Sequence, residues 1–432
     1  MQIHVVRPGE SVSSIARAYG VTAARIVAAN GIRGQRGLAV GEALVIPITG
    51  SFYTVRPGDT IFLIARRYGL APRELARVNR INPAMLLRVG QRLYIPPRAR
   101  RPVEANAYAE PTGGRVSENL RSSVEETARS LTYVAPFSYR MKRDGSLEAP
   151  PLDNIPALAR QGGATLMMAV TNIEGDTFSA EVAEAVLGSE AVQDRLLANI
   201  IRIAGEVGYS DVHFDMEFLR PEDREPYNRF LRRAAERIHG AGLLMSTALA
   251  PKISATQRGQ WYEAHDYRTH GQVADFVVIM TYEWGYSGGP PQAVSPIGPV
   301  RQVLEYAMSE MPASKIMMGQ NLYGYDWTLP YVRGGPFARV VSPQEAVELA
   351  VREGVPIQYD ERAQAPFFRY TDDAGKTHEV WFEDARSIQA KFDLIRELGL
   401  RGISYWKLGI AFPQNWVLLN DNFNVTKRAR RG

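Results

Sequence analysis

The feature that most constrains the fold of this chain is a repeat within its first hundred residues. Arg7-Pro8-Gly9 recurs as Arg56-Pro57-Gly58, 49 residues later. The same offset, without a gap, relates four further pairs: Gly20 and Gly69, Asn30 and Asn79, Gly41 and Gly90, and Pro47 and Pro96. Chance does not hold such a register over forty residues, so we interpret the segment as a duplicated structural unit.

Each copy of the repeat has the pattern strand, helix, helix, strand. Short apolar runs at 3–6 and 52–55 precede a Pro-Gly turn and predict strands. Ser11 and Thr60 then stand where a hydroxyl can accept from the first free amides of a helix, and Gly20 and Gly69 suit left-handed helix ends. Ala43–Ile46 and Leu93–Ile95 close the units as strands, so each copy is a βααβ module.

In both copies this pattern resembles the LysM module, over residues 1–48 and 51–97. The resemblance rests on the Arg-Pro-Gly-(Glu/Asp)-(Ser/Thr) opening, a helix ending in Tyr-Gly, the Asn, and the closing Val-Gly-(Glu/Gln)-x-Leu-x-Ile-Pro. LysM modules bind glycans that contain N-acetylglucosamine, in a groove between the first strand–helix turn and the last helix–strand turn. The resemblance therefore implies sugar binding, although Gly9, Gly58 and the Asn residues could each serve only to make turns.

After a short linker at 98–102, apolar strands alternate with amphipathic helices through residue 426. Eight strands are predicted: Val103–Ala109, Leu131–Tyr139, Ala164–Thr171, Asp211–Phe218, Leu243–Ala250, Asp275–Glu283, Lys315–Gly324 and Gly402–Leu408. Several are almost wholly apolar, as parallel strands covered on both faces are. The pattern predicts an α/β fold, a (β/α)8 TIM barrel over 103–426. A small α+β insertion, about 328–384, should lie between strands seven and eight, with a hairpin at Phe367–Phe382.

The composition narrows the classes of partner. The 51 basic and 46 acidic residues leave a net charge of +5, and no basic patch interleaved with aromatic residues suggests nucleic acid. The Arg-rich runs 98–101 and 427–431 are interpreted as a linker and a frayed tail. With no cysteine there is no disulfide or thiolate metal site, and no cofactor or metal is expected. No apolar run is long enough to span a membrane, and no standard secretory signal is visible.

The fourth predicted strand carries the strongest chemical signal. Alternation places Asp211, His213, Asp215 and Glu217 on one face of this strand, opposite Val212, Phe214 and Met216. Polar groups inside a barrel are costly unless they pair or act, and active sites lie at the C-terminal ends of barrel strands. We therefore expect a site here, with a satisfied polar network as the alternative.

This strand resembles the signature of glycoside hydrolase family 18, Asp-x-x-Asp-x-Asp-x-Glu. Glu217 matches the proton-donating Glu of the family and Asp215 matches the last Asp. The two earlier Asp positions hold Ser210 and His213, so His213 would have to replace the partner of Asp215. The resemblance implies that Glu217 is the general acid, with Asp215 beside it.

Other segments agree with this resemblance. Met280-Thr281-Tyr282-Glu283 resembles the Met-Thr-Tyr-Asp segment of the family, in which the Tyr binds the acetamido carbonyl of the substrate. Trp406 matches the Trp under the sugar, and aromatic faces suit the apolar C–H faces of sugars. The predicted catalytic residues are thus Glu217, Asp215 and Tyr282. The predicted substrate-binding residues are His213, Met280, Glu283, Asn321, Tyr323, Asp326 and Trp406.

Two LysM modules joined to such a barrel resemble the SleL/YaaH group of spore cortex-lytic enzymes. That resemblance implies an N-acetylglucosaminidase of peptidoglycan, located in the spore cortex or coat or on the cell wall, acting by substrate-assisted retaining hydrolysis. Its partner would be peptidoglycan or another glycan containing N-acetylglucosamine. A chitinase, or an inactive glycan-binding coat protein, are the alternatives.

Overall fold

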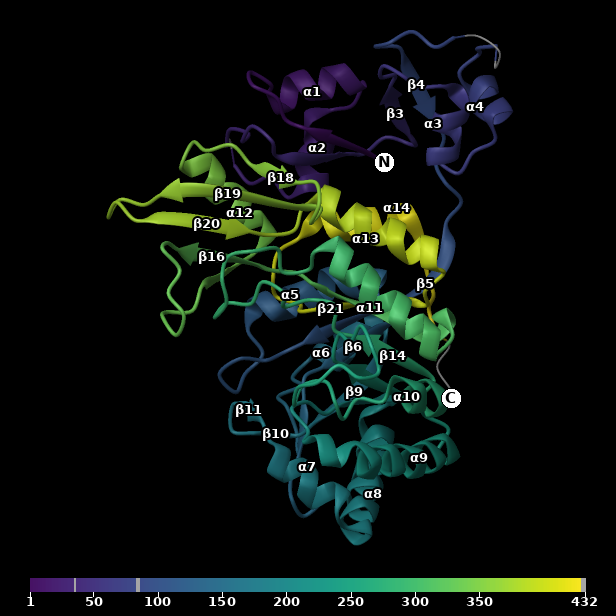
Figure 1. The fold of residues 1–432 in the computed structure, drawn as a ribbon, viewed down its shortest axis with the longest axis vertical. Coiled ribbons are helices and arrows are strands. Elements are labelled where there is room, and N and C mark those ends of the chain that lie inside the picture. Colours follow the sequence, from purple (N-terminus) through teal and green to yellow (C-terminus); the bar gives the residue numbers. More distant parts are fainter. Residues whose placement is uncertain (35, 83–85, 429–432) are drawn as a thin grey trace.

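Both copies of the repeat fold as antiparallel βααβ units in the computed structural model, which describes residues 1–34, 36–82 and 86–428 (Figure 1). Module 1 (residues 1–48) contains β1 (Gln2–Val5), α1 (Val12–Tyr19), α2 (Ala23–Asn30) and β2 (Ala43–Ile46). Module 2 (residues 51–97) contains β3 (Ser51–Thr54), α3 (Ile61–Arg67), α4 (Pro72–Val78) and β4 (Arg92–Ile95). Ser11 and Thr60 cap the first helices as predicted, because their hydroxyls accept from the amides of Ser14 and Leu63.

Eight parallel strands close into the predicted barrel. They run in the order β5 (Arg101–Ala109), β6 (Tyr133–Pro136), β9 (Thr165–Thr171), β12 (Tyr209–Asp215), β13 (Leu244–Leu249), β14 (Phe276–Ile279), β15 (Ile316–Asn321) and β21 (Gly402–Trp406). The pairing of β21 with β5 and of β12 with β9 leaves no open edge in the ring. β5 begins inside the expected linker, since Arg101 already pairs with the sheet.

Helices cover the outside of the barrel, as the alternating pattern predicts (Figure 1). The covering helices are α5 (Glu118–Thr127), α6 (Ile155–Gln161), α7 (Ala180–Leu187), α8 (Glu190–Val207), α9 (Arg224–Gly240), α10 (Tyr267–Val273), α11 (Ile297–Glu310), α13 (Ala385–Leu398) and α14 (Pro413–Asn422). Single 3-10 turns stand at Ala128–Ser130, Pro221–Asp223 and Ala313–Lys315. Short strands lie in the segments that follow β6 and β9: β7 (Tyr139–Met141), β8 (Leu147–Glu148), β10 (Ile173–Glu174) and β11 (Thr177–Phe178).

The insertion between β15 and β21 is an α+β lobe, as predicted. Its five-stranded sheet runs β17 (Arg339–Val341), β16 (Gly324–Thr328), β20 (Thr377–Trp381), β19 (Ala365–Thr371) and β18 (Gln358–Asp360). Helix α12 (Pro343–Arg352) contributes Ala346, Leu349 and Ala350 to the core behind the sheet. The lobe starts at Gly324, because the chain turns directly out of β15 into β16, whereas the expected start was about 328.

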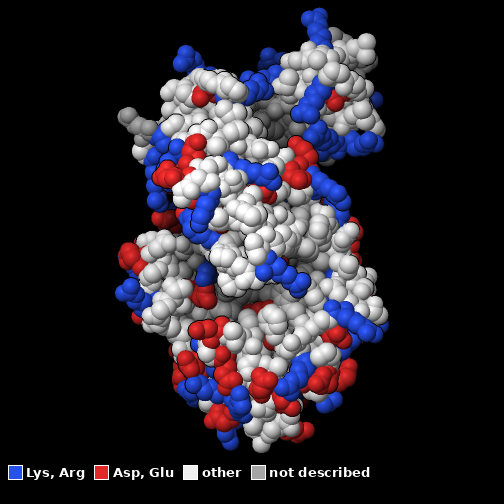
Figure 2. All heavy atoms as spheres, turned by 60° about the vertical axis from the view of Figure 1, so that its left-hand side comes forward, with Lys and Arg blue, Asp and Glu red and all other residues white. Residues whose placement is uncertain are grey.

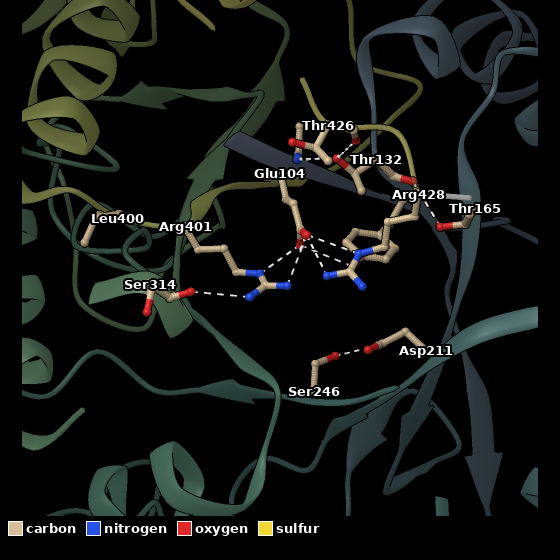
Figure 3. A network of polar contacts seen from close by, with 12 residues as sticks. Glu104, Thr132, Thr165, Asp211, Ser246, Ser314, Leu400, Arg401, Thr426 and Arg428 are labelled. Carbon is tan, nitrogen blue, oxygen red and sulfur yellow. Dashed lines mark hydrogen bonds and ion pairs between the residues drawn. The ribbon is translucent and has the colours of Figure 1, made fainter. Parts of the chain in front are cut away.

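A buried ion-pair network closes the N-terminal end of the barrel (Figure 3). Glu104 on β5 accepts hydrogen bonds from Arg401 at 2.8 Å and from Arg428 at 2.7 Å. Lys427 donates to three carbonyl oxygens, those of Ala128, Leu131 and Gly162. The interpretation of 427–431 as a frayed tail is therefore wrong for Lys427 and Arg428, which follow β22 (Phe423–Val425). Residues 429–431 lie outside the described part of the chain.

Module 1 is docked against the barrel and the insertion. The side chain of Gln344 in α12 donates to the carbonyl of Gly31 at 2.9 Å, and that of Gln414 in α14 donates to Asn30 at 2.8 Å. The amide of Ile357 donates to the carbonyl of Val40 at 2.8 Å. These contacts fix the segment between α2 and β2 of module 1 against the rest of the chain. Figure 1 shows α2 beside α14.

Module 2 has the same internal structure without this docking surface. Asn79 makes the internal hydrogen bonds that Asn30 makes in module 1, to the backbone of the closing strand. Gly41 and Gly90 share a φ of +84°, but a methyl group on Gly41 would overlap the backbone of Ile357, whereas one on Gly90 would meet nothing within 4 Å. The two modules therefore have the same fold in different surroundings.

Candidate active site

A cavity of about 450 Å³ opens at the C-terminal ends of the barrel strands. Figure 2, which brings this side of the molecule forward, shows a hollow across the middle with acidic side chains in and below it. Its size is typical of sites for small ligands. The lining residues are Tyr108, Glu110, Phe137, Ile173, Asp176, Phe178, Asp215, Glu217, Trp261, Met280, Tyr282, Glu283, Tyr323, Tyr325, Val340, Trp406, Lys407 and Ile410.

Strand β12 delivers two carboxyl groups to this cavity. Asp215 ends the strand and Glu217 follows two residues later, and both are at most 9 % exposed. The alternating residues Val212, Phe214 and Met216 are buried in the core on the other face. The alternation expected from the sequence is thus present, and it turns the two carboxyl groups to the same side.

Backbone and side-chain contacts hold Glu217 in place. The Asn172 side chain clamps its backbone, accepting from the Glu217 amide at 3.0 Å and donating to the Glu217 carbonyl at 2.9 Å. The indole N–H of Trp261 donates to the Glu217 carboxyl oxygen Oε2. Burial raises the pKa of Glu217 well above its usual value, the charge of Asp215 raises it further, and the bond from Trp261 lowers it.

Asp215 lies beside Glu217 and shares its environment. Burial raises the pKa of Asp215 above the usual value for an aspartate. Among the described residues its Oδ1 has no hydrogen-bond partner, although the atom is buried. A buried acceptor without a partner is costly unless a ligand supplies the donor, so Asp215 is suited to bind an N–H or O–H group.

The segment 280–283 forms a second wall of the cavity. Tyr282 lies there, and burial together with the nearby Tyr108 and the carboxyl groups of Asp215 and Glu217 raises the pKa of its hydroxyl. Its hydroxyl therefore stays protonated and can donate a hydrogen bond. Glu283 accepts hydrogen bonds from the hydroxyls of Tyr323 and Tyr325, and Met280 adds an apolar surface.

Aromatic rings line the base of the cavity. Trp406, at the end of β21, packs edge-on against Phe137 with ring centroids 4.8 Å apart and against Tyr108 at 5.4 Å. These contacts leave Trp406 half-buried, so part of its ring faces the cavity. A fixed aromatic surface of this kind suits the apolar face of a sugar ring.

His213 lies beneath the cavity and does not contact Asp215. Its Nε2 is 2.8 Å from the Tyr108 hydroxyl, and its Nδ1 is 2.8 Å from the Ser246 hydroxyl, which in turn donates to Asp211. Nδ1 therefore carries the hydrogen, and Nε2 accepts from Tyr108. Burial lowers the pKa of His213 to about 3, so the ring is neutral. The expected pairing with Asp215 is replaced by a bond to Tyr108, which does line the cavity.

Two further predicted binding residues lie outside the cavity wall. Asp326 belongs to β16 of the insertion, where its carboxylate accepts from Arg339, Tyr370 and His378. Asn321 is fully buried at the end of β15 and donates to the carbonyl of Tyr323. Both side chains are thus hydrogen-bonded to neighbouring residues. The chain also leaves the barrel wall immediately after Asn321. We do not assign either to substrate binding.

Several residues that line the cavity or hold its carboxyl groups escaped the sequence analysis. Asn172 directly follows β9, and a polar residue at the C-terminal end of a barrel strand is a signal that could have identified it. Trp261 lies in an irregular segment between β13 and α10, where no periodicity marks a residue. Glu110 and Lys407, which pair across the rim, follow β5 and β21.

Two negative observations hold for the described residues. None of their helices combines the length and the apolar character that a membrane crossing requires. No group of three or more His, Cys, Asp or Glu side chains lies close enough together to hold a metal ion.

Comparison with known proteins agrees with this geometry. The model of the glycosyl hydrolases family 18 matches residues 131–410, and the LysM domain model matches 4–47 and 53–96. The chain is 63% identical over 431 residues to the cortical fragment-lytic enzyme of Bacillus subtilis (strain 168), covering 100% of both chains. It is 52% identical over 429 residues to the enzyme of that name in Bacillus anthracis, covering 99% of this chain and 100% of the relative.

Solved structures show the same arrangement of domains. The crystal structure of the spore cortex-lytic enzyme SleL of Bacillus cereus matches with a TM-score of 0.92 and 48% identity, covering 99% of both chains. That of Bacillus megaterium QM B1551 matches with a TM-score of 0.89 and 52% identity, also covering 99% of both. These matches confirm the resemblances drawn from the sequence: the chain belongs to family 18 of the glycosyl hydrolases and carries two LysM domains.

Proposed function

We propose that the protein is a peptidoglycan hydrolase of the spore cortex, an N-acetylglucosaminidase that its LysM modules hold on the glycan. The observation that carries the proposal is the buried pair Asp215 and Glu217 in a cavity floored by Trp406. The cortex as target is supported by the names of the relatives, which describe enzymes that lyse cortical fragments or spore cortex.

Glu217 acts first as a general acid. Its raised pKa favours the protonated form of the carboxyl group up to a higher pH than in an ordinary glutamate, as a general acid requires. That proton passes to the glycosidic oxygen as the bond from this oxygen to the anomeric carbon breaks. After the leaving sugar departs, the Glu217 carboxylate removes a proton from the water that attacks the same carbon.

The acetamido group of the substrate supplies the nucleophile in this reaction, as family membership implies. Its carbonyl oxygen bonds to the anomeric carbon and forms an oxazolinium ion, which water then opens with net retention. Asp215 accepts the acetamido N–H through its unpaired Oδ1 and stabilises the positive charge. Tyr282 donates its hydroxyl hydrogen to the acetamido oxygen and so aligns it.

The charge of the cavity favours an uncharged sugar at its centre. Five carboxyl groups line it, those of Glu110, Asp176, Asp215, Glu217 and Glu283, whereas Lys407 is the only cation among the described lining residues. Lys407 is already paired with Glu110. The lactyl carboxylate of a muramic acid would find no unpaired cation among the described lining residues, which favours cleavage after N-acetylglucosamine.

The modules differ from the cavity in charge. Residues 1–97 contain thirteen arginines and four acidic residues, a net charge of +9, while the whole chain carries +5. In module 2, no ion pair within 4.0 Å joins any of the eight arginines to a carboxylate of the described residues. A cationic module would be retained on a wall polymer that carries peptide carboxylates, in addition to any sugar contact.

The experiment that tests the cleavage specificity is mass spectrometry of reduced fragments after digestion of cortex peptidoglycan. N-acetylglucosamine at the new reducing ends is expected, and muramic acid there would contradict the proposal. Chitin oligomers tested in parallel separate this function from that of a chitinase, which would cleave them in preference to peptidoglycan. A glycan-binding coat protein without activity would release no fragments.

Co-sedimentation tests the role of the modules. Binding of the full chain to peptidoglycan should weaken as salt rises, since charge contacts are screened, while binding to uncharged chitin should change little. Equal salt dependence on both polymers would contradict a contribution from the arginines.

A further inference from the structure

A second cavity, of about 680 Å³, lies in the seam between module 1 and the barrel. Module 1 contributes α2 and the turn after it, including Gly31, Ile32 and Arg33. The barrel contributes the exposed face of α5 and the loop 409–413 that leads from β21 into α14.

The seam cavity and the catalytic cavity share a wall residue. Ile410 lines both. The loop that carries it begins directly after Trp406, at the base of the catalytic cavity, and reaches Pro413, which packs against Gly31 of module 1. The two cavities therefore adjoin at Ile410.

The lining of the seam suits a sugar chain better than it suits a dry packing gap. Trp416 offers an aromatic ring, Ser122 a hydroxyl, Glu126 a carboxylate and Arg33 a guanidinium group. Glu126 and Arg33 are exposed. Aromatic surface combined with a few polar groups is the usual composition of a carbohydrate site, whereas empty packing defects are apolar.

The seam is a fixed feature because module 1 is held on both sides of it. Gln344 and Gln414 bind the turn at Asn30 and Gly31, and Gly409, within the barrel loop, is held by Asn119 and Ser123 of α5. The equivalent turn of module 2 has Arg80 in place of Gly31, in the same left-handed conformation. The close approach of Pro413 thus requires glycine in module 1 alone.

We infer that the seam is a glycan subsite continuous with the catalytic cavity, so that module 1 guides long N-acetylated chains into the barrel. This inference rests on the proposed function, because it assumes that the catalytic cavity cleaves such chains. Module 1 then acts as part of the active-site cleft, and module 2 is the module free to bind glycan elsewhere.

Blocking the seam tests this inference in the full-length protein. Ala28 is an exposed residue of α2 that lines the seam, so Ala28→Trp would fill it without contact with the catalytic residues. Arg77→Trp, at the position 49 residues later in module 2, is the matched control. The substrates are peptidoglycan glycan chains of defined length, from short chains that fill only the catalytic cavity to long ones.

For Ala28→Trp, kcat/KM on long chains should fall about tenfold, the effect of losing about 1.4 kcal/mol of binding, while short chains are cleaved as before. Arg77→Trp should leave both unchanged. Ser122→Trp fills the seam from α5, outside module 1. It should reproduce the loss if the seam binds glycan, whereas a loss that Ala28→Trp causes only by displacing module 1 would not recur in this variant. Unchanged cleavage of long chains by both seam variants, or equal loss on short and long chains, would overturn the inference. Failure of the proposed function is a different result, because the unmodified protein would then release no fragments with N-acetylglucosamine at their new reducing ends from peptidoglycan chains of any length.

Discussion

The docking of module 1 predicts a large difference between two identical substitutions. Gly41 and Gly90 are equivalent positions of the repeat with the same φ of +84°. Alanine at either position costs about 1–2 kcal/mol, because a side chain is strained in the left-handed region. Only at Gly41 would the new methyl group also overlap a neighbouring backbone, that of Ile357.

The extra cost at Gly41 follows from what must move. To make room, the segment at Ile357 must withdraw, which breaks the bond from the Ile357 amide to Val40 and strains that from Arg386 to the Gly41 carbonyl. Losing one neutral hydrogen bond costs about 0.5–1.5 kcal/mol, and one from a charged donor about 1.5–3 kcal/mol. We therefore expect Gly41→Ala to weaken the docking by about 2–4 kcal/mol more than Gly90→Ala does.

Hydrogen exchange measured by mass spectrometry can detect this difference in docking free energy in the peptides that form the contact. A change of 2–4 kcal/mol in the free energy of local opening corresponds to exchange roughly thirty- to several-hundred-fold faster, here in peptides spanning Val40 and Ile357. Gly90→Ala should leave these peptides at the rate of the unmodified protein. Equal protection in the two variants would refute the view that the contact at Gly41 holds module 1 to the barrel.

Three further predictions concern the barrel. Glu217→Gln should keep the fold, shown by an unchanged circular dichroism spectrum, and reduce turnover by about a hundred- to ten-thousand-fold, whereas a loss below tenfold would place the acid elsewhere. Trp261→Phe removes the bond that lowers the pKa of Glu217, so the alkaline limb of the pH–rate profile should move to higher pH, and a fixed limb would contradict the contact. The pKa of His213 is lowered from 6.5 to about 3, so below pH 6.5 the unfolded chain binds a proton that the folded protein excludes. The contribution of His213 to the free energy of unfolding therefore falls by about 1.4 kcal/mol per pH unit in that window, and His213→Asn should remove this component from the pH dependence of urea unfolding between pH 7 and 5 while the pH–rate profile stays as it was.

The barrel was predictable from the sequence because parallel strands covered on both faces are continuous apolar runs. All eight predicted strands are present, and their ends differ for physical reasons. The predicted strand Asp275–Glu283 forms its ladder only over Phe276–Ile279, because the amides of Thr281 and Tyr282 donate to the carbonyls two residues earlier, and Glu283 then has a φ of +68°. The carboxyl pair of β12 was predictable too, since alternation along a strand fixes which residues share a face.

Contacts between residues far apart in the chain could not be predicted from the sequence. The partners of His213 come from β5 and β13, so spacing along β12 suggested Asp215 and not Tyr108. Trp261 belongs to a loop without periodicity. The docking of module 1 is reflected in the sequence at one position, where module 1 has Gly31 and module 2 has Arg80. A single difference between two copies of a repeat does not reveal its cause.

The order of strands around the barrel has a consequence for folding during synthesis. β5, the first strand to be made, lies between β6 and β21, and it also pairs with β22. Among the described residues, Glu104 is paired with Arg401 and Arg428, which lie 297 and 324 residues further along the chain. Until β21 and the residues after it have been made, the edges of β5 and β15 have no strand between them and Glu104 lacks Arg428. Such a closure between distant segments is slow, and an unpaired edge is prone to aggregate until it forms. The LysM modules, whose internal contacts are local, can fold early, whereas the barrel and its cavity are complete only once β21 has been released.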